Sequence, residues 1–230
     1  MKTIGLIGGM SWESSASYYR MLNEQVKQRL GGLHSAECLM YSVDFEEIER
    51  FQSQGKWQEA GERLANVARS LEKGGAELIV LCTNTMHKVI SSIEEAVTIP
   101  VVHIADATAK EIHANHLHTV GLIGTKYTME QDFYKERIAD SGIKVLIPEA
   151  AERDMINQVV FDELCLGEIL DSSKVEFQKV IQKLIDRGAE GIILGCTEIG
   201  LLIQQDDAEI PLFDTAKIHV EAAVKEALDH

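Results

Sequence analysis

An internal duplication constrains the fold of this chain more than any other feature of its sequence. Three blocks of the first half recur in the second half in the same order and at nearly the same spacing. The pairs are KTIGLIGGM (from Lys2) with HTVGLIGTK (from His118), GGAELIVLCTNT (from Gly74) with RGAEGIILGCTE (from Arg187), and TIPVVHIADA (from Thr98) with EIPLFDTAKI (from Glu209). Repeated blocks in a fixed order are typical of a duplicated structural unit. We therefore predict two halves that share one topology.

Short apolar segments alternate with amphipathic segments in each half, which is the pattern of strands and helices in an α/β fold. From Trp57 to Lys73, for example, apolar residues recur every three or four positions, as they do on one face of a helix. The apolar runs lack an alternation with polar residues, and this favours parallel strands buried on both faces of a sheet. The expected strands are Thr3–Ile7, Cys38–Ser42, Leu78–Cys82, Val101–Ile104, Val120–Ile123, Val145–Ile147, Gly191–Leu194 and Leu212–Phe213.

Two such halves, packed face to face about a pseudo-twofold axis, would bring the carboxyl ends of both sets of strands to one cleft, where ligands of α/β sheets bind. Small polar residues follow these strand ends. The repeat aligns Thr83 with Cys196, Asn84 with Thr197, Thr85 with Glu198, and Gly9, Met10 and Ser11 with Thr125, Lys126 and Tyr127. Helix capping explains Ser11, Thr85 or Thr128 taken singly. The whole set favours a binding site, because N–H groups at helix starts attract carboxylates.

Charge and composition narrow the class of ligand. The chain has 22 Lys and Arg residues against 37 Asp and Glu residues, a formal net charge of −15. This balance argues against nucleic acid and anionic membranes as partners, and a 6% aromatic content argues against base stacking. A signal peptide is not expected, since glycines interrupt the apolar N-terminal run. A membrane-spanning segment is not expected either, because the longest apolar runs, such as Leu78 to Cys82, are far shorter than a membrane span. Four cysteines without a CxxC spacing then predict free thiols in a cytoplasmic protein.

Cys196 is the strongest candidate for chemistry. It follows an apolar strand and precedes an expected helix start, a position that lowers the pKa of a thiol and makes the thiolate available. The alternative is a buried, inert cysteine, which is the commoner fate of a free thiol. Cys82 is expected to point into the sheet packing, because successive side chains of a strand face opposite sides.

Neither a metal ion nor an organic cofactor is predicted. A site built from Cys82, His87 and Cys196 would match no known zinc spacing. The GLIGGM segment lacks the third glycine of a dinucleotide fingerprint, and no phosphate-binding lysine follows it.

Several motifs together resemble a known family. They are GLIGGMSWESSASYY near the N-terminus, CTNTMH at 82–87, GTKYTMEQDFY at 124–134, GCTE at 195–198 and FDTAKIHVEAAV near the end. These segments resemble the aspartate/glutamate racemases that work without pyridoxal phosphate. The resemblance implies two flavodoxin-like domains with the substrate between them, residues 1–104 with a returning helix at 216–230, and residues 105–215. It also implies a homodimer.

In that family two cysteines flank the substrate α-carbon, one as the thiolate that removes the proton and one as the thiol that delivers it. This sequence departs from the pattern, because the residue before Asn84 is Thr83 rather than cysteine. A shift of one position turns a strand residue to the other face, so Cys82 should not substitute for it. Cys165 stands where many members carry a lysine. By resemblance, Cys196 deprotonates the L-enantiomer, and reprotonation comes from the Thr83 side.

The remaining roles are assigned by position. Asn84, Thr85, Thr197 and Glu198 are expected to hold the α-carboxylate and ammonium groups of L-aspartate or L-glutamate. Met10, Ser11, Thr125 and Thr128 line the strand ends. The side-chain carboxylate needs a donor from the loop after the second strand, where Arg50 and Gln52 both lie, and Gln52 is assigned to it. Three other functions stay open: a broad-range amino-acid racemase, a one-cysteine decarboxylase-like lyase, and a non-catalytic amino-acid-binding protein.

Overall fold

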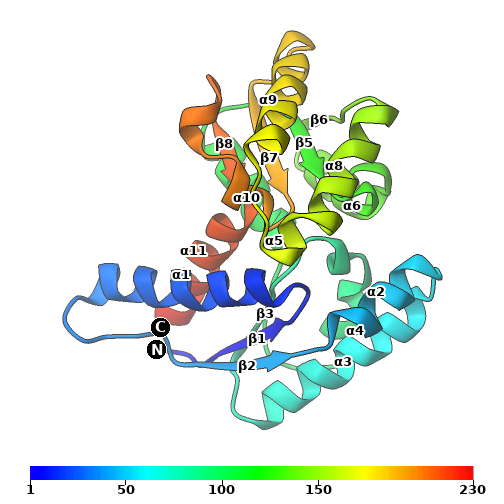
Figure 1. The fold of residues 1–230 in the computed structure, drawn as a ribbon. Helices are drawn as coiled ribbons and strands as arrows, with labels where there is room; N and C mark the ends of the chain where they lie inside the picture. The colour runs from blue at the N-terminus through cyan, green and yellow to red at the C-terminus, as the bar shows by residue number, and fades with distance from the viewer. Residues whose placement is uncertain (230) are drawn as a thin grey trace. The chain divides into compact units, whose positions relative to one another are not determined.

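Two four-stranded parallel sheets with the same strand order form the framework of the chain. The computed structural model describes residues 1–229 and divides them into two units, Met1–His103 with the segment from His219 onward, and Ile104–Ile218 (Figure 1). The first sheet has the order β2-β1-β3-β4 and the second the order β6-β5-β7-β8. Every strand pair in both sheets is parallel. The predicted fold class, two similar α/β halves with parallel sheets, is confirmed.

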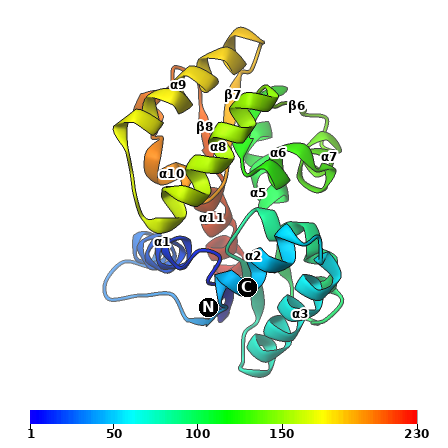
Figure 2. The same cartoon turned by 45° about the vertical axis from the view of Figure 1, so that its right-hand side comes forward.

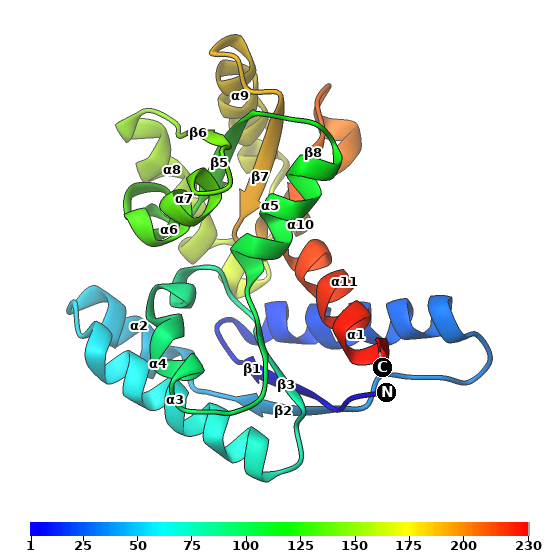
Figure 3. The ribbon, with the colours of Figure 1, turned by 180° about the vertical axis from the view of Figure 1, so that it is seen from behind.

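The first unit has a sheet covered by helices on both faces. Its strands are β1 (Ile4–Gly8), β2 (Cys38–Ser42), β3 (Leu78–Leu81) and β4 (Val101–Val102). Its helices are α1 (Trp12–Leu30), α2 (Phe45–Ser53), α3 (Trp57–Lys73), the 3-10 turn η1 (Thr85–Val89) and α4 (Ile90–Glu94). Figures 1 and 3 show α1 and α3 on opposite faces of the sheet.

Burial on both faces explains why β1 and β3 are apolar throughout. All residues of these two strands are buried, and α3 packs its own apolar stripe against β1 and β2. Leu64, Val67 and Leu71 are buried members of that stripe. The helix predicted from Trp57 to Lys73 is confirmed with the same bounds. The strand predicted at 101–104 is shorter, because Ile104 already begins the next helix.

The second unit repeats the arrangement. Its strands are β5 (Thr119–Gly124), β6 (Lys144–Leu146), β7 (Gly191–Gly195) and β8 (Leu212–Asp214). Its helical elements are α5 (Ile104–Ala114), α6 (Lys126–Glu130), α7 (Asp132–Ala139), α8 (Ala150–Asp162), η2 (Leu164–Leu166), α9 (Asp171–Asp186), α10 (Ile199–Leu202) and η3 (Gln205–Asp207). Figure 2 shows α8 and α9 side by side, and Figure 3 shows α5 against β8.

The last helix, α11 (Thr215–Leu228), belongs to both units. At its start, Thr215 Oγ1 donates a hydrogen bond to the carbonyl oxygen of Leu194 over 2.7 Å. Near its end, Lys2 N donates to the carbonyl oxygen of Ala227 over 2.8 Å, which ties the helix to the N-terminal segment. Residue 230, which the sequence prediction assigns to this helix, lies outside the described residues. Within residues 1–229, each helix is too short or too polar to cross a membrane.

Candidate active site

Strands β5 and β7 bring two predicted site residues to adjacent strand ends in the second unit. Gly124 and Gly195 are partners in the parallel register of these strands. A Cβ atom on Gly124 would lie 2.7 Å from the carbonyl oxygen of Gly195, so a side chain there would force the strands apart. Thr125 and Cys196 are the next residues of the two strands and therefore leave the sheet beside each other.

The thiol of Cys196 is hydrogen-bonded to a buried carboxylate. Its Sγ donates to Oε2 of Glu198 over 3.0 Å, and Oγ1 of Thr197 donates to the same oxygen over 2.8 Å. Cys196 is 7% exposed and Glu198 is 3% exposed. Bonds to an ionised acceptor are stronger than neutral ones, so the carboxylate fixes both donors.

The environment of Cys196 raises the pKa of its thiol well above the ordinary value. Burial is the largest cause, because it disfavours the charged thiolate, and the negative charge of Glu198 adds to it. The sequence predicts a lowered pKa at this helix start, and that prediction is wrong. Helix α10 has only four residues, and its N-terminus is outweighed by burial and by the neighbouring carboxylate. In the resting protein Cys196 is therefore a protonated thiol.

Thr125 provides the cap of helix α6. Its Oγ1 accepts a hydrogen bond from Thr128 N over 3.3 Å, and the two hydroxyl oxygens are 3.1 Å apart. Both side chains are buried. Thr128 lies inside α6, so the prediction that it caps a helix is wrong. The chain enters the helix directly after β5, which moves the capping position back to Thr125.

In the first unit a tight turn follows β3 and carries Thr83 and Asn84. Thr83 N donates to the carbonyl oxygen of Leu81 over 2.8 Å. The carbonyl oxygen of Thr83 in turn accepts a hydrogen bond of 2.7 Å from Nδ1 of His87. Asn84 occupies the N-cap position of η1 without a side-chain capping bond. Thr85 is the first residue of η1, so the prediction that Thr85 is a cap is wrong.

Cys82 is enclosed by the sheet. Its side chain is fully buried, and its Sγ donates to the carbonyl oxygen of Val80 over 3.8 Å. Burial raises the pKa of this thiol far above its ordinary range. The predicted orientation of Cys82 into the packing agrees with this environment, and Thr83 is the next residue, in the turn that follows β3.

The predicted cap at Ser11 is confirmed. Its Oγ accepts from Ser14 N over 3.2 Å at the start of α1. Ser15 Oγ accepts a bond from Gly9 N over 2.7 Å and donates to the carbonyl oxygen of Ser11 over 2.9 Å. Met10 is buried in the core of the first unit. Ser14 Oγ also reaches the carbonyl oxygen of Cys82 at 3.4 Å, which links this turn to the end of β3.

Comparison with known proteins gives the family. The family described as Asp/Glu/Hydantoin racemase matches residues 7–223. The chain belongs to this racemase family. A solved structure of a candidate Asp/Glu racemase from Yersinia pestis is 53% identical, with each chain covered fully and a TM-score of 0.92. That of an aspartate racemase homologue from Pyrococcus horikoshii OT3 is 36% identical, again with full coverage of both chains and a TM-score of 0.87.

A further relative of this racemase-family chain is described as acting on a broad range of amino acids. The broad specificity amino-acid racemase RacX of Bacillus subtilis (strain 168) is 22% identical over 96% of each chain. The resemblance to the racemases that the sequence motifs indicate is thus confirmed at the level of the family.

Gln52 occupies a different element from the one predicted. It lies inside α2, not in a loop, and is 5% exposed. Its Nε2 contacts Sδ of Met86 at 3.0 Å, so the Gln52 side chain packs against η1.

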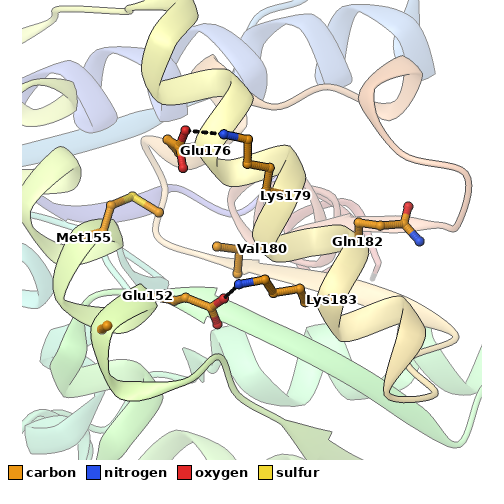
Figure 4. A pocket seen from close by; sticks show the side chains of 8 residues that line it. Glu152, Met155, Glu176, Lys179, Val180, Gln182 and Lys183 are labelled. Atoms are coloured by element: carbon orange, nitrogen blue, oxygen red, sulfur yellow. Dashed lines mark hydrogen bonds and ion pairs between the residues drawn. The ribbon is translucent and has the colours of Figure 1, made fainter.

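A surface hollow lies apart from all of these residues. It has a volume of about 510 Å³ and lies between α8 and α9 (Figure 4). Ion pairs of 2.6 Å join Glu152 to Lys183 and Glu176 to Lys179 along its wall. No predicted site residue lines this hollow. Within residues 1–229, no group of three or more His, Cys, Asp or Glu side chains is arranged to hold a metal ion.

The sequence prediction missed the contact between Cys196 and Glu198. It assigned Glu198 to substrate binding, whereas in the structure the Glu198 carboxylate accepts a hydrogen bond from the Cys196 thiol. The spacing C-T-E, with an acid two residues after a cysteine at a helix start, is the signal that could have indicated it.

Proposed function

We propose that this chain interconverts the L- and D-enantiomers of aspartate or glutamate by removing and replacing the α-proton, without pyridoxal phosphate. The observation that carries the proposal is the buried Cys196–Glu198 pair at the end of β7 in a member of this racemase family. The full-length similarity to the aspartate racemase homologue of Pyrococcus horikoshii supports the acidic substrate.

Cys196 is the base that acts on the L-enantiomer in this proposal. A thiol with a raised pKa needs a proton acceptor before it can act as a base, and Glu198 Oε2 lies 3.0 Å from its Sγ. The thiol proton moves to Glu198, and the thiolate then takes the α-proton. The electron pair of the Cα–H bond stays on the substrate, where hydrogen-bond donors stabilise the charge that develops on the α-carboxylate. The total charge of the Cys–Glu pair is the same before and after the first transfer.

The Thr83 side delivers the proton to the opposite face of the α-carbon, directly from its hydroxyl or through water. A threonine hydroxyl is a weak base, so the D-to-L direction depends on such a relay. Since the two enantiomers have equal free energies, kcat/KM must be equal in both directions. An asymmetry between Cys196 and Thr83 can therefore appear only in kcat and KM separately.

The other predicted residues are assigned to substrate binding. Asn84, Thr85 and Thr197 would hold the α-carboxylate and ammonium groups. Met10, Ser11, Thr125 and Thr128 would shape the strand ends around them, and Gln52 would face the side-chain carboxylate. We also propose that the protein is a homodimer, as the resemblance of its motifs implies, and that it is cytoplasmic, because its cysteines are free thiols.

A wider substrate range is the second candidate. It is favoured by the neutral amide of Gln52, which would discriminate less strongly for an acidic side chain than an arginine would. The relationship to a broad specificity amino-acid racemase supports the same view.

Proton NMR in deuterium oxide tests the proposal. The purified protein is incubated with L-aspartate or L-glutamate without added cofactor, the α-proton signal is followed, and the products are separated by chirality. We expect loss of the α-proton signal together with formation of the D-isomer, and loss of both in Cys196→Ala. Release of carbon dioxide would indicate a lyase instead. Binding without exchange of any amino acid would indicate a binding protein.

A further inference from the structure

Three buried histidines and a tyrosine meet next to the turn that carries Thr83. His87 lies on η1, His103 follows β4, His219 is on α11 and Tyr18 is on α1. The centroid of the His87 ring is 4.6 Å from that of His103 and 5.8 Å from that of His219, and the ring of Tyr18 is 5.8 Å from His219. All four side chains are at most 6% exposed. Elements far apart in the sequence therefore support one turn.

The hydrogen bonds assign the position of the imidazole protons. A carbonyl oxygen can only accept, so His87 donates from Nδ1 to Thr83 O over 2.7 Å. His219 likewise donates from Nε2 to Val102 O over 2.7 Å. Burial lowers the pKa of His219 to about 4, so this ring is neutral near pH 7 and its Nδ1 accepts a 3.0 Å bond from the hydroxyl of Tyr18. The two histidines therefore donate to backbone carbonyls from different ring nitrogens, His87 from Nδ1 and His219 from Nε2.

This arrangement fixes the backbone from which the Thr83 side chain projects. The Thr83 carbonyl is held by His87, while Thr83 N is already bonded to Leu81 O. The ring of His87 packs against that of His219, whose two nitrogens are bonded to α1 and to β4. The duplicated half has no equivalent, because Gly200 stands where the repeat aligns His87.

We propose that His87 is a positioning residue for Thr83, and that His219, fixed by Tyr18 and Val102, holds the His87 ring in place. The inference rests on the proposed function, since it concerns the Thr83 side of the same reaction. The two proposed proton-transfer groups are held in different ways. Cys196 donates a hydrogen bond to the Glu198 carboxylate, whereas the backbone carbonyl of Thr83 accepts a hydrogen bond from His87. Misplacing a reacting group by about 1 Å costs on the order of 100-fold in rate, so the hydrogen bond that holds the Thr83 backbone should affect the rate of proton transfer.

Asparagine and glutamine variants separate the hydrogen bonds from the rings. The amide nitrogen of asparagine takes the position of imidazole Nδ1, and that of glutamine takes the position of Nε2. His87→Asn therefore keeps the donor to Thr83 O, whereas His87→Gln removes it. At position 219 the pattern reverses, because His219→Gln keeps the donor to Val102 O and His219→Asn removes it.

The readout is the ratio of D-isomer formed to deuterium incorporated at the α-carbon of recovered L-aspartate in deuterium oxide. We expect His87→Gln to lower this ratio about tenfold and His87→Asn to stay within about threefold of the unsubstituted protein. Thermal unfolding of each variant measures any global loss of structure. Equal loss of both rates in the two His87 variants, with the ratio unchanged, would overturn the positioning role.

Long-range ¹H–¹⁵N spectra of histidine-labelled protein give a second readout that does not depend on activity. We expect an Nδ1–H tautomer at His87 and an Nε2–H tautomer at His219 at pH 7, with signals assigned from the variants. The opposite tautomer at His87, or a charged His219, would overturn the inference. If the unsubstituted protein exchanged no amino-acid α-proton, the proposed function would fail, and the spectra would still report on the hydrogen bond to Thr83 separately.

Discussion

The thiol of Cys196 donates a hydrogen bond to Oε2 of Glu198 over 3.0 Å, and both side chains are buried at the carboxyl end of β7. In the proposed reaction, this carboxylate would accept the thiol proton, which a thiol with a raised pKa must lose before it can act as a base.

Replacing Glu198 by glutamine should separate thiol acidity from catalysis. Removing the carboxylate charge should lower the pKa of Cys196, because that charge contributes to its elevation. It should also remove the proton acceptor and lower kcat by about 100-fold or more. The pH dependence of Cys196 alkylation measures the first effect, and α-proton exchange of L-aspartate measures the second. Glu176→Gln, on the exposed ion pair with Lys179, is the control and should change neither. Full activity of Glu198→Gln would argue against the acceptor role.

Thr83→Val should slow formation of the D-isomer by about 100-fold, because it removes the hydroxyl and keeps the shape. Exchange at the α-carbon of recovered L-aspartate should persist, since Cys196 is intact. Thr83→Cys should change the ratio of kcat values in the two directions while kcat/KM stays equal. Chiral chromatography of the reaction measures each isomer.

Cys82→Ala is the matched control for the neighbouring position. Its thiol is enclosed by the sheet, so the variant should keep the ratio of D-isomer to exchanged L-isomer. The opposite result would be a large fall of that ratio in Cys82→Ala together with normal turnover in Thr83→Val. It would assign the second proton-transfer role to Cys82 instead.

His219 should make the stability of the protein depend on pH. Its pKa falls from 6.5 to about 4 on folding, so the unfolded state binds more protons between these values. Stability should be complete above pH 6.5 and decline as the pH falls toward 4, by up to about 3 kcal/mol. The groups that face this ring are Tyr18 on α1, His87 on η1 and the Val102 carbonyl on β4.

Urea unfolding at several pH values checks this expectation. His219→Gln keeps the donor to Val102 O and cannot titrate, so it should flatten the decline between pH 6.5 and 4. An identical decline in this variant would assign the pH dependence to other groups.

Gly124→Ala should destabilise the second unit and disturb the position of Cys196. The new Cβ would lie 2.7 Å from Gly195 O, a backbone atom that can move only if the strands separate. Overpacking of this kind costs about 1–3 kcal/mol. Differential scanning calorimetry measures the loss, and α-proton exchange at a temperature where the variant is folded measures the effect on Cys196. An unchanged unfolding temperature would contradict the close approach of β5 and β7.

The architecture could be predicted from the order of the residues. The repeated blocks predicted two parallel sheets of one topology, because apolar patterning is a local property that each element carries in its own residues. The same repeat aligned Thr83 with Cys196, and the strand ends deliver these residues to the equivalent place in each unit.

The chemical state of those residues depends on tertiary packing. The position of Cys196 before a helix predicted a lowered pKa, whereas burial and the charge of Glu198 raise it. The neighbours of His87 come from α1, α11 and the end of β4, which no local pattern brings together. A thiol's acidity and an imidazole's tautomer depend on the groups and the burial around them, and these exist only once distant segments have packed.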